Sequence, residues 1–344
     1  EDLIFKTDGE KHLRLTTKGQ LEVLNTGNSV FIGENAGSSD DLSDNLNVFI
    51  GNDVGKENVS GYANTVIGAN AFQNNVDGKE NTYVGYESGL ENTSGSYNTV
   101  FGFRAFKNNL TGQENAIIGR ESMASNVDGS LNTTLGEHTL VNGTSHKRSV
   151  ALGWRAGFGQ NSGGASQTGG IFIGTEAGRD IQTGSYNTFI GFWSGIINTT
   201  GEENIFLGRY AGGSNTTGSR NIYIGKSSGI HVNGDDNIIL GNGIEVPIRT
   251  GSNQLNIGSL IFGNNIDGTG TGISTGNIGI GIKSPNAKLD IDGGIKIADD
   301  TDTCDSTKIG TLRYNADANN SYVDMCMQTG VSTYAWETIK TKTW

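Results

Sequence analysis

One spacing dominates this sequence: a glycine that closes a short apolar segment returns about every 17 residues along most of the chain. The successive spacings are 18, then 17 six times, then 21, 17, 17, 17, 16 and 17 residues. The glycines of this column are Gly33, Gly51, Gly68, Gly85, Gly102, Gly119, Gly136, Gly153, Gly174, Gly191, Gly208, Gly225, Gly241 and Gly258. Such a period predicts a repeat protein in which each unit packs only against its neighbours. The spacing of 21 contains the extra glycines of residues 157–170, which predict a loop that leaves an otherwise regular coil.

The segment in front of each of these glycines predicts a β-strand. Segments such as NTVIG, NTYVG and NIYIG are rich in β-branched and aromatic residues and are too short for helices. Glycine and asparagine bound them, and both tolerate the left-handed backbone that tight corners need. One asparagine column holds Asn47, Asn64, Asn81, Asn98, Asn115, Asn132, Asn187, Asn204, Asn221 and Asn237, and a second holds Asn58, Asn75, Asn92, Asn109, Asn126, Asn198 and Asn215. Each repeat is therefore expected to be one coil of a parallel β-solenoid, with asparagine amides that hydrogen-bond between coils at the corners.

The composition agrees with a folded, all-β chain. The 344 residues include 54 glycines but only 2 prolines, whereas collagen needs abundant proline and a glycine at every third position. The many Val, Ile, Phe and Tyr residues argue against disorder. With one strand per repeat and ~4.8 Å between strands, fourteen repeats predict a shaft of roughly 65 Å.

The charge balance excludes two classes of partner. The chain has 24 basic and 36 acidic residues, a net charge of -12. It offers no cluster of Lys and Arg to neutralise a phosphate backbone, and an anionic lipid surface would repel it. No apolar run approaches the ~20 residues that a membrane helix needs. We therefore expect neither nucleic-acid binding nor membrane insertion.

Each strand presents two apolar columns, because successive strand residues point to opposite faces. A thin coil has a single interior, so one of the two columns has to lie outside, and a long exposed apolar stripe marks an interface. We assign the column of middle strand residues to the outside and predict that three coils pack it around a common axis as a homotrimer. This column is Phe31, Phe49, Val66, Tyr83, Val100, Ile117, Phe172, Phe189, Phe206, Tyr223 and Ile239.

The repeats resemble those of known fibrous proteins. Their N-T-Φ-Φ-G-x-x-A pattern is similar to the N-S-V-A-I-G-x-x-S repeats in the heads of trimeric autotransporter adhesins, which are left-handed parallel β-rolls. Residues 276–297, GNIGIGIKSPNAKLDIDGGIKI, resemble a connector found near the end of many phage tail fibres. The resemblance implies an elongated homotrimeric fibre built on a left-handed, β-roll-like solenoid. The adhesin repeat is usually shorter than the repeat of this chain, so the coil here is expected to be wider.

Four segments follow from the repeat and the resemblance. Residues 1–27 are an N-terminal β segment, and residues 28–262 are the solenoid shaft of about fourteen repeats. Residues 263–297 form the connector, and residues 298–344 are a small C-terminal β module similar to those at the ends of phage and bacterial surface fibres. A module of this size is marginally stable on its own.

The two cysteines, Cys304 and Cys326, both lie in the C-terminal module. A disulfide that stabilises a small module in an oxidising exterior explains the pair, and two buried thiols are the alternative. A zinc site is not expected, because no second pair of Cys or His lies at ligand spacing. No catalytic, cofactor-binding or metal-binding residue is predicted, since the four histidines are scattered and no nucleophile motif accompanies them.

These features predict a non-enzymatic structural fibre for host-surface attachment, as in phage tail fibres or phage-like injection devices. A trimeric adhesin on a bacterial cell surface is the alternative, because it shares the architecture. The expected partners are further copies of the chain, other fibre or baseplate proteins, and a host cell-surface glycan or protein, in a virion or an extracellular setting. A polysaccharide-cleaving enzyme would need two carboxylates that converge in a cleft, and no repeat carries paired inward acids. A threonine array for ice binding is not expected either, because residues such as Ala116 and Val150 interrupt the threonine column.

Recognition is expected where the repeat is broken and aromatic side chains are exposed. The candidates are Trp154, which lies beside the insertion, and Tyr322, Tyr334 and Trp336 in the C-terminal module. Aromatic rings stack on the apolar faces of sugars while polar neighbours bind the hydroxyl groups. For Tyr322 and Trp336, filling the core of the module is an equal alternative.

Overall fold

The computed structural model describes residues 2–24, 27–159, 167–295, 303–316, 321–330 and 332–339, without the side chains of residues 314–316, 321 and 322. The chain divides into two compact units, Glu1–Asp290 and Ile291–Trp344. Every regular element in the described residues is a β-strand, so a membrane-spanning helix is absent from this part of the chain. The all-β prediction is confirmed.

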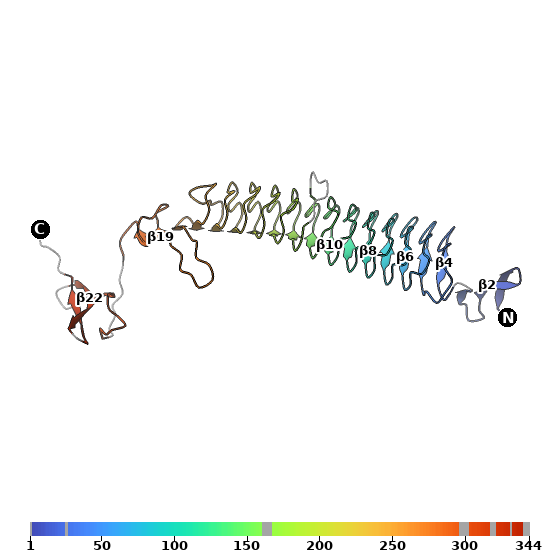
Figure 1. The fold of residues 1–344 in the computed structure, drawn as a ribbon, viewed down its shortest axis with the longest axis horizontal. Coiled ribbons are helices and arrows are strands. Elements are labelled where there is room, and N and C mark those ends of the chain that lie inside the picture. The colour runs from blue at the N-terminus through green and yellow to red at the C-terminus, as the bar shows by residue number, and fades with distance from the viewer. Residues whose placement is uncertain are drawn as a thin grey trace. The chain divides into compact units, whose positions relative to one another are not determined.

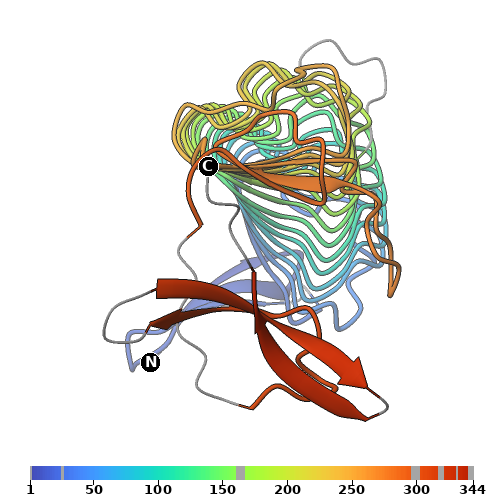
Figure 2. The same ribbon diagram turned by 90° about the vertical axis from the view of Figure 1, so that its left-hand side faces the viewer.

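Strands β4–β17 form a parallel β-solenoid (Figure 1). Their bounds are β4 (Val30–Ile32), β5 (Val48–Ile50), β6 (Thr65–Ile67), β7 (Thr82–Val84), β8 (Thr99–Phe101), β9 (Ala116–Ile118), β10 (Thr133–Leu135), β11 (Val150–Leu152), β12 (Ile171–Ile173), β13 (Thr188–Ile190), β14 (Ile205–Leu207), β15 (Ile222–Ile224), β16 (Ile238–Leu240) and β17 (Leu255–Ile257). Each strand pairs in parallel with the next, as when Thr65 pairs with Thr82. The strands lie in one row along the stacked coils in Figure 1, and Figure 2 shows successive coils repeating a similar outline. The predicted solenoid and its period are confirmed.

Short antiparallel sheets make up the remaining regular structure. Strands β1 (Leu3–Thr7), β2 (Glu10–Leu15) and β3 (Leu21–Val23) form a sheet of their own before the solenoid. Strand β18 (Ile261–Asn264) turns back against β17 and pairs with β19 (Asn277–Ile280), and β20 (Leu289–Ile291) follows. In the second unit, β21 (Leu312–Ala316), β22 (Ser321–Gly330) and β23 (Thr333–Thr338) form a separate antiparallel sheet.

The solenoid strands are short because a glycine and a left-handed residue turn the chain directly after each of them. Gly51 has a φ of +146°, and a Cβ on it would lie 2.6 Å from the carbonyl oxygen of Gly68 in the next coil. Asp53, which follows shortly after that glycine, has a φ of +49°. Hydrogen bonds between coils continue beyond this corner, because the Gly55 N–H donates to the carbonyl oxygen of Ala71 at 3.0 Å. The coils are therefore bonded to each other on more than the strand side.

The middle residues of the strands fill the interior of the coil, so the prediction that they face outward toward a trimer axis is wrong. This column is Phe31, Phe49, Val66, Tyr83, Val100, Ile117, Phe172, Phe189, Phe206, Tyr223 and Ile239. Phe31 is partly buried in the first coil, and the other side chains of the column are fully buried. The assignment of the two apolar columns to inside and outside has to be exchanged.

The physical reason is that two positions, the middle of the strand and a later position beyond the corner, share the interior of each regular coil. Where the strand carries an aromatic residue, the later position is glycine: a Cβ on Gly195 would lie 2.6 Å from the ring of Phe189. Where the strand carries a smaller residue such as Val66, the later position holds a large one, Phe72, with a φ of +53° that is close to the +56° of Gly195. Rings stack between coils, as between Phe189 and Phe206 with centroids 4.9 Å apart. The strand middle and the later position therefore never carry two aromatic rings in the same coil, because one ring fills the space that they share.

Asparagine amides hydrogen-bond from coil to coil, as the two asparagine columns predict. The Nδ2 of Asn98 donates to the Oδ1 of Asn81 at 3.2 Å and to the carbonyl oxygen of Gly112 at 2.9 Å. The Oδ1 of Asn98 accepts from the backbone N and the Nδ2 of Asn115 at 3.1 and 2.9 Å. Amides of the second column bond to one another in the same way. Most of these buried amides therefore satisfy each other along the stack, and the exceptions in the second column are atoms of Asn126, Asn198 and Asn215.

Candidate binding surfaces

The outer face of the solenoid sheet is apolar along its length. We call the first and third residues of strands β4–β17 the outer sheet face. The third residues are Ile32, Ile50, Ile67, Val84, Phe101, Ile118, Leu135, Leu152, Ile173, Ile190, Leu207, Ile224, Leu240 and Ile257. Leu135 exposes 53% of its surface and Ile118 exposes 46%. The sequence predicted an apolar column on the outside of the coil, but assigned it to the middle strand residues instead of the third ones.

The corner that follows the sheet carries a second row of side chains, most of them exposed or partly exposed, with Glu87 and Glu176 buried among them. Its members are the first and second residues after the strand-closing glycine, in the coils from Gly85 to Gly225. They are Tyr86, Glu87, Phe103, Arg104, Arg120, Glu121, Glu137, His138, Trp154, Arg155, Thr175, Glu176, Phe192, Trp193, Arg209, Tyr210, Lys226 and Ser227. We call this row the corner ladder. Trp154, a predicted recognition residue, belongs to it and is exposed.

Ion pairs link neighbouring coils within and beside the corner ladder. The carboxylate of Glu87 accepts from the Nε of Arg104 and the Nζ of Lys107, both at 2.8 Å. The hydrogen bond from the Lys107 ammonium is the main cause that lowers the pKa of Glu87 to about 2. Arg120 pairs with Glu137 in the next coil at 2.8 Å. The charged side chains are therefore fixed relative to the rings beside them.

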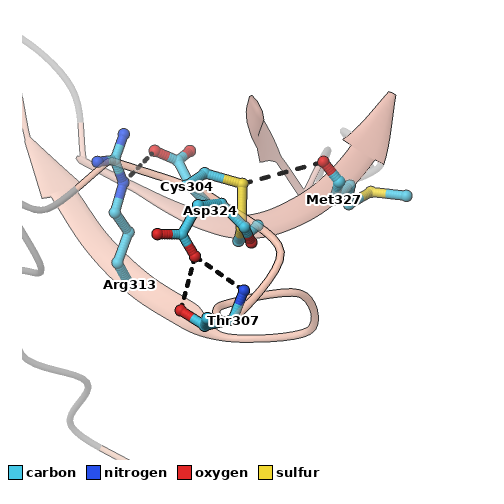
Figure 3. The surroundings of a disulfide bond; sticks show 7 residues. Cys304, Thr307, Arg313, Asp324 and Met327 are labelled. Atoms are coloured by element: carbon cyan, nitrogen blue, oxygen red, sulfur yellow. Dashed lines mark hydrogen bonds and ion pairs between the residues drawn. A yellow bond between two sulfur atoms is a disulfide. The ribbon is translucent and has the colours of Figure 1, made fainter. Parts of the chain in front are cut away.

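Cys304 and Cys326 are joined by a disulfide in the second unit (Figure 3). The bond connects the segment before β21 to β22, and the side chain of Cys326 is fully buried. Beside it, the Nε of Arg313 donates to the Oδ2 of Asp324 at 3.2 Å (Figure 3). The covalent bond and this ion pair hold a sheet that is too small to have a large core.

The recognition residues predicted in the C-terminal module are less exposed than Trp154. Tyr334 and Trp336 lie on β23 and are half-buried. The guanidinium of Arg313 lies over the Trp336 ring, 4.3 Å from its centroid. The side chain of Tyr322 lies outside the described residues. Among the predicted recognition residues whose side chains are described, only Trp154 lies on the solenoid, where its ring is exposed.

The histidines are not brought together. His138 pairs with Glu121 at 2.9 Å within the corner ladder. His231 lines a hollow of about 990 Å³ near the C-terminal end of the solenoid, where Glu245 pairs with it at 2.6 Å. His146 is buried inside the coil stack. The described histidines therefore form no common site.

Sequence reasoning missed the rings of the corner ladder other than Trp154. Reading the residue directly after each strand-closing glycine as a column would have found Tyr86, Phe103, Trp154 and Phe192 together. That signal was available, but aromatic residues in a repeat were interpreted as strand residues only. The outer sheet face and the corner ladder lie on consecutive segments of each coil.

In the described residues, no group of three or more His, Cys, Asp or Glu side chains is arranged to hold a metal ion. Comparison with known proteins assigns no family, because no protein-family model, no curated protein and no solved structure matches this chain.

Proposed function

We propose that this chain is a non-enzymatic fibre protein that assembles as a homotrimer and serves attachment to a host surface. The solenoid is the shaft, and the attachment partner is a cell-surface glycan or protein met by a virion or another extracellular particle. The support is the resemblance of the repeats and of residues 276–297 to fibrous attachment proteins, together with the outer sheet face.

The outer sheet face is the observation that carries the assembly. The column of third strand residues is apolar over fourteen strands and partly or fully exposed, which marks a surface that packs against another. Fourteen strands at ~4.8 Å and three residues at ~3.3 Å give a face of roughly 600 Å² per copy. Standard interfaces bury ~800 Å² per partner, so this face is of the right order for a stable contact. Further copies of the chain are the occupants that match it, because they offer an equally long and straight face.

Charge substitutions on the outer sheet face test the assembly. Leu207→Asp together with Ile224→Asp places carboxylates in the proposed contact, where burying an unpaired charge is costly. The matched control is Val76→Asp together with Leu110→Asp, two similarly exposed side chains that lie outside the strands. We expect sedimentation velocity to show trimers for the wild type and the control, and monomers with an unchanged circular dichroism spectrum for the first pair. A wild-type monomer at micromolar concentration, or equal dissociation of both pairs, contradicts the proposal.

Immunogold electron microscopy tests the attachment role. Antibodies against the solenoid are applied to intact particles and cells of the source material. Label along projecting fibres supports the proposal, and its position on a virion or on a cell separates the tail-fibre form from the adhesin form. Label that appears only after the particles or cells are ruptured contradicts an attachment role.

A further inference from the structure

We propose that the corner ladder is a binding strip for an extended acidic polysaccharide, which lies along the solenoid with successive sugar units against successive coils. The inference deepens the attachment role proposed above and rests on it, since it names the class of partner and the surface that binds it.

The first argument is the position of the rings. Large apolar rings inside the coils are buried, whereas four rings in the first column of the corner ladder are exposed. Their exposed fractions are 41% for Tyr86, 39% for Phe103, 43% for Trp154 and 40% for Phe192. Arg120, Glu137 and Thr175 divide the column into three apolar groups, which are Tyr86 with Phe103, then Trp154, then Phe192. Separate apolar groups along a line suit a ligand with small, repeated apolar faces, which is the character of a chain of pyranose sugars.

The second argument is the geometry of the rings. Tyr86 and Phe103 stack across two coils, with centroids 5.4 Å apart and an interplanar angle of 17°. Farther along, the rings of Phe192 and Trp193 lie 4.4 Å apart, and Tyr210 meets Trp193 edge-on at 4.8 Å. Contacts of this kind hold rings in fixed orientations. A ligand that stacks on them finds the platforms already arranged and loses little free energy in ordering them.

The third argument is the placement of cations beside the rings. Arg155 lies 5.0 Å from the centroid of Trp154, and Arg209 lies 5.9 Å from that of Phe192. Arg209 and Lys226 are exposed and form no ion pair with the described residues. A guanidinium beside a ring can bind a carboxylate through two hydrogen bonds while the sugar stacks on that ring.

The fourth argument is local charge. The corner ladder contains five cationic residues, Arg104, Arg120, Arg155, Arg209 and Lys226, against four glutamates, Glu87, Glu121, Glu137 and Glu176, which leaves a net charge of +1. The whole chain carries -12. The strip therefore has a net charge of opposite sign to that of the whole chain, which favours contact of an anionic polymer with the strip.

The length of the strip favours a polymer over a small ligand. Nine coils at ~4.8 Å give a row of about 40 Å from the first ring to Lys226. The spacing of the coils is close to the length of one pyranose unit in an extended chain.

Binding of defined polymers to the intact chain tests the proposal. Hyaluronan and alginate supply uronate carboxylates, and dextran is the neutral probe; binding is measured by biolayer interferometry at two salt concentrations. We expect the wild type to bind the uronate polymers at least tenfold more tightly than dextran and to lose affinity as salt rises. Trp154→Ala with Phe192→Ala should lower the affinity at least tenfold, and Arg209→Ala with Lys226→Ala should lower it and flatten the salt dependence.

The matched control comes from a similar cluster elsewhere on the solenoid. Tyr62 and Tyr97 are as exposed as the ladder rings and flank Lys79, which lies 5.3 and 5.9 Å from their centroids. Tyr62→Ala with Tyr97→Ala should leave the affinity unchanged. The proposal is overturned by a wild type that binds neither uronate polymer, by equal binding to dextran, or by equal loss in the control. Sedimentation of the same samples separates the two proposals: a trimer that does not bind removes the strip alone, and a monomer that binds removes the assembly alone.

Discussion

The regular coils of residues 61–132 and the interrupted coils of residues 137–183 share one strand ladder but differ inside. In the regular coils, buried amides such as Asn98 bond to both neighbours. In the interrupted coils the first asparagine column continues as Ser149 and Gly170. His146 and Gln167 stand where the regular repeats begin with glycine.

Buried side-chain atoms without a hydrogen-bond partner occur in both kinds of coil: the regular coils hold the Ser88 Oγ and the Asn126 Nδ2, and the interrupted coils hold those of His146 and Gln167. Among the described residues, neither ring nitrogen of His146 and neither amide atom of Gln167 has a hydrogen-bond partner. The coil of β11 also has no large side chain at the two shared interior positions, because Ala151 is the middle residue of the strand and Gly157 occupies the later position. Side chains from the adjoining coils reach in, since a Cβ on Gly157 would lie 2.6 Å from Leu140.

The strand ladder nevertheless continues through this region without a break. Val150 pairs with Thr133 on one side and, across the longer repeat, with Ile171 on the other. The outer sheet face and the corner ladder therefore pass the interruption intact. The difference teaches that the outer surfaces depend on strand pairing, whereas the amide columns can stop for two coils without ending the solenoid.

The largest expected effect on stability comes from giving the coil of Tyr83 and Gly89 the interior residues of the coil of Val66 and Phe72. Gly89→Phe alone forces a second ring into the space of Tyr83 and should lower the free energy of unfolding by at least about 3 kcal/mol. Tyr83→Val alone leaves a cavity and should cost about 3 kcal/mol. The double variant reproduces the arrangement of Val66 and Phe72 and should return to within about 2 kcal/mol of the wild type. Urea unfolding of all four proteins measures the coupling.

An additive result in this cycle contradicts the inference that the strand middle and the later position have room for only one aromatic ring per coil. The left-handed backbone is not an obstacle to the double variant, because Phe72 adopts a φ of +53° and Gly89 one of +60°.

Acidification should act first on the interrupted coils. Burial lowers the pKa of His146 to about 4, and a backbone contact with Leu140 opposes this only in part. The unfolded chain, with a pKa of about 6.5 for histidine, binds this proton more readily than the folded one, so stability is full above pH ~6.5 and falls as the pH drops toward 4. The loss over this window should reach about 3 kcal/mol.

Unfolding at pH 7 and pH 4.5 measures the effect of acid. His146→Gly restores the glycine of the regular repeat and should flatten the pH dependence. His12→Gln, at an exposed histidine whose ring lies 2.7 Å from the Thr7 hydroxyl, should leave it as in the wild type. A slope that survives His146→Gly assigns the acid sensitivity to other groups.

Removing one amide has the smallest expected effect and separates the two kinds of coil. Asn98→Ala leaves the Asn115 N–H without its acceptor, removes a donor from the Gly112 carbonyl, and should cost about 2 kcal/mol. Ser149→Ala removes one bond, from Oγ to the carbonyl oxygen of Lys147 at 3.2 Å, and should cost less than about 1 kcal/mol. Thermal unfolding compares them. Equal costs would show that the amide column contributes nothing beyond a single hydrogen bond.

Much of the shaft could be predicted from the sequence. The segment NTVIG predicts one strand of the solenoid, and β6 spans Thr65–Ile67 within that segment. The extra residues after Gly157 mark the interruption, and the asparagine columns indicate the amide bonds. The sequence of a single strand does not show whether Val66 or Tyr83 points into the coil or outward, because both faces of the strand carry apolar residues. The overlooked signal was a correlation in size within each coil: the aromatic Tyr83 is followed six residues later by Gly89, and the smaller Val66 by Phe72.

The sequence by itself determined the period, the strands and the corners, because glycine, asparagine and short β-branched runs act through local backbone preferences. The tertiary structure alone decided which apolar column is inside and which side chains line the corner ladder. Alternation along a strand defines two faces but does not say toward which of them the chain closes. That choice follows from the turn at each corner and from an interior volume that exists only once the coil is closed, where the strand middle and the later position share space for one aromatic ring.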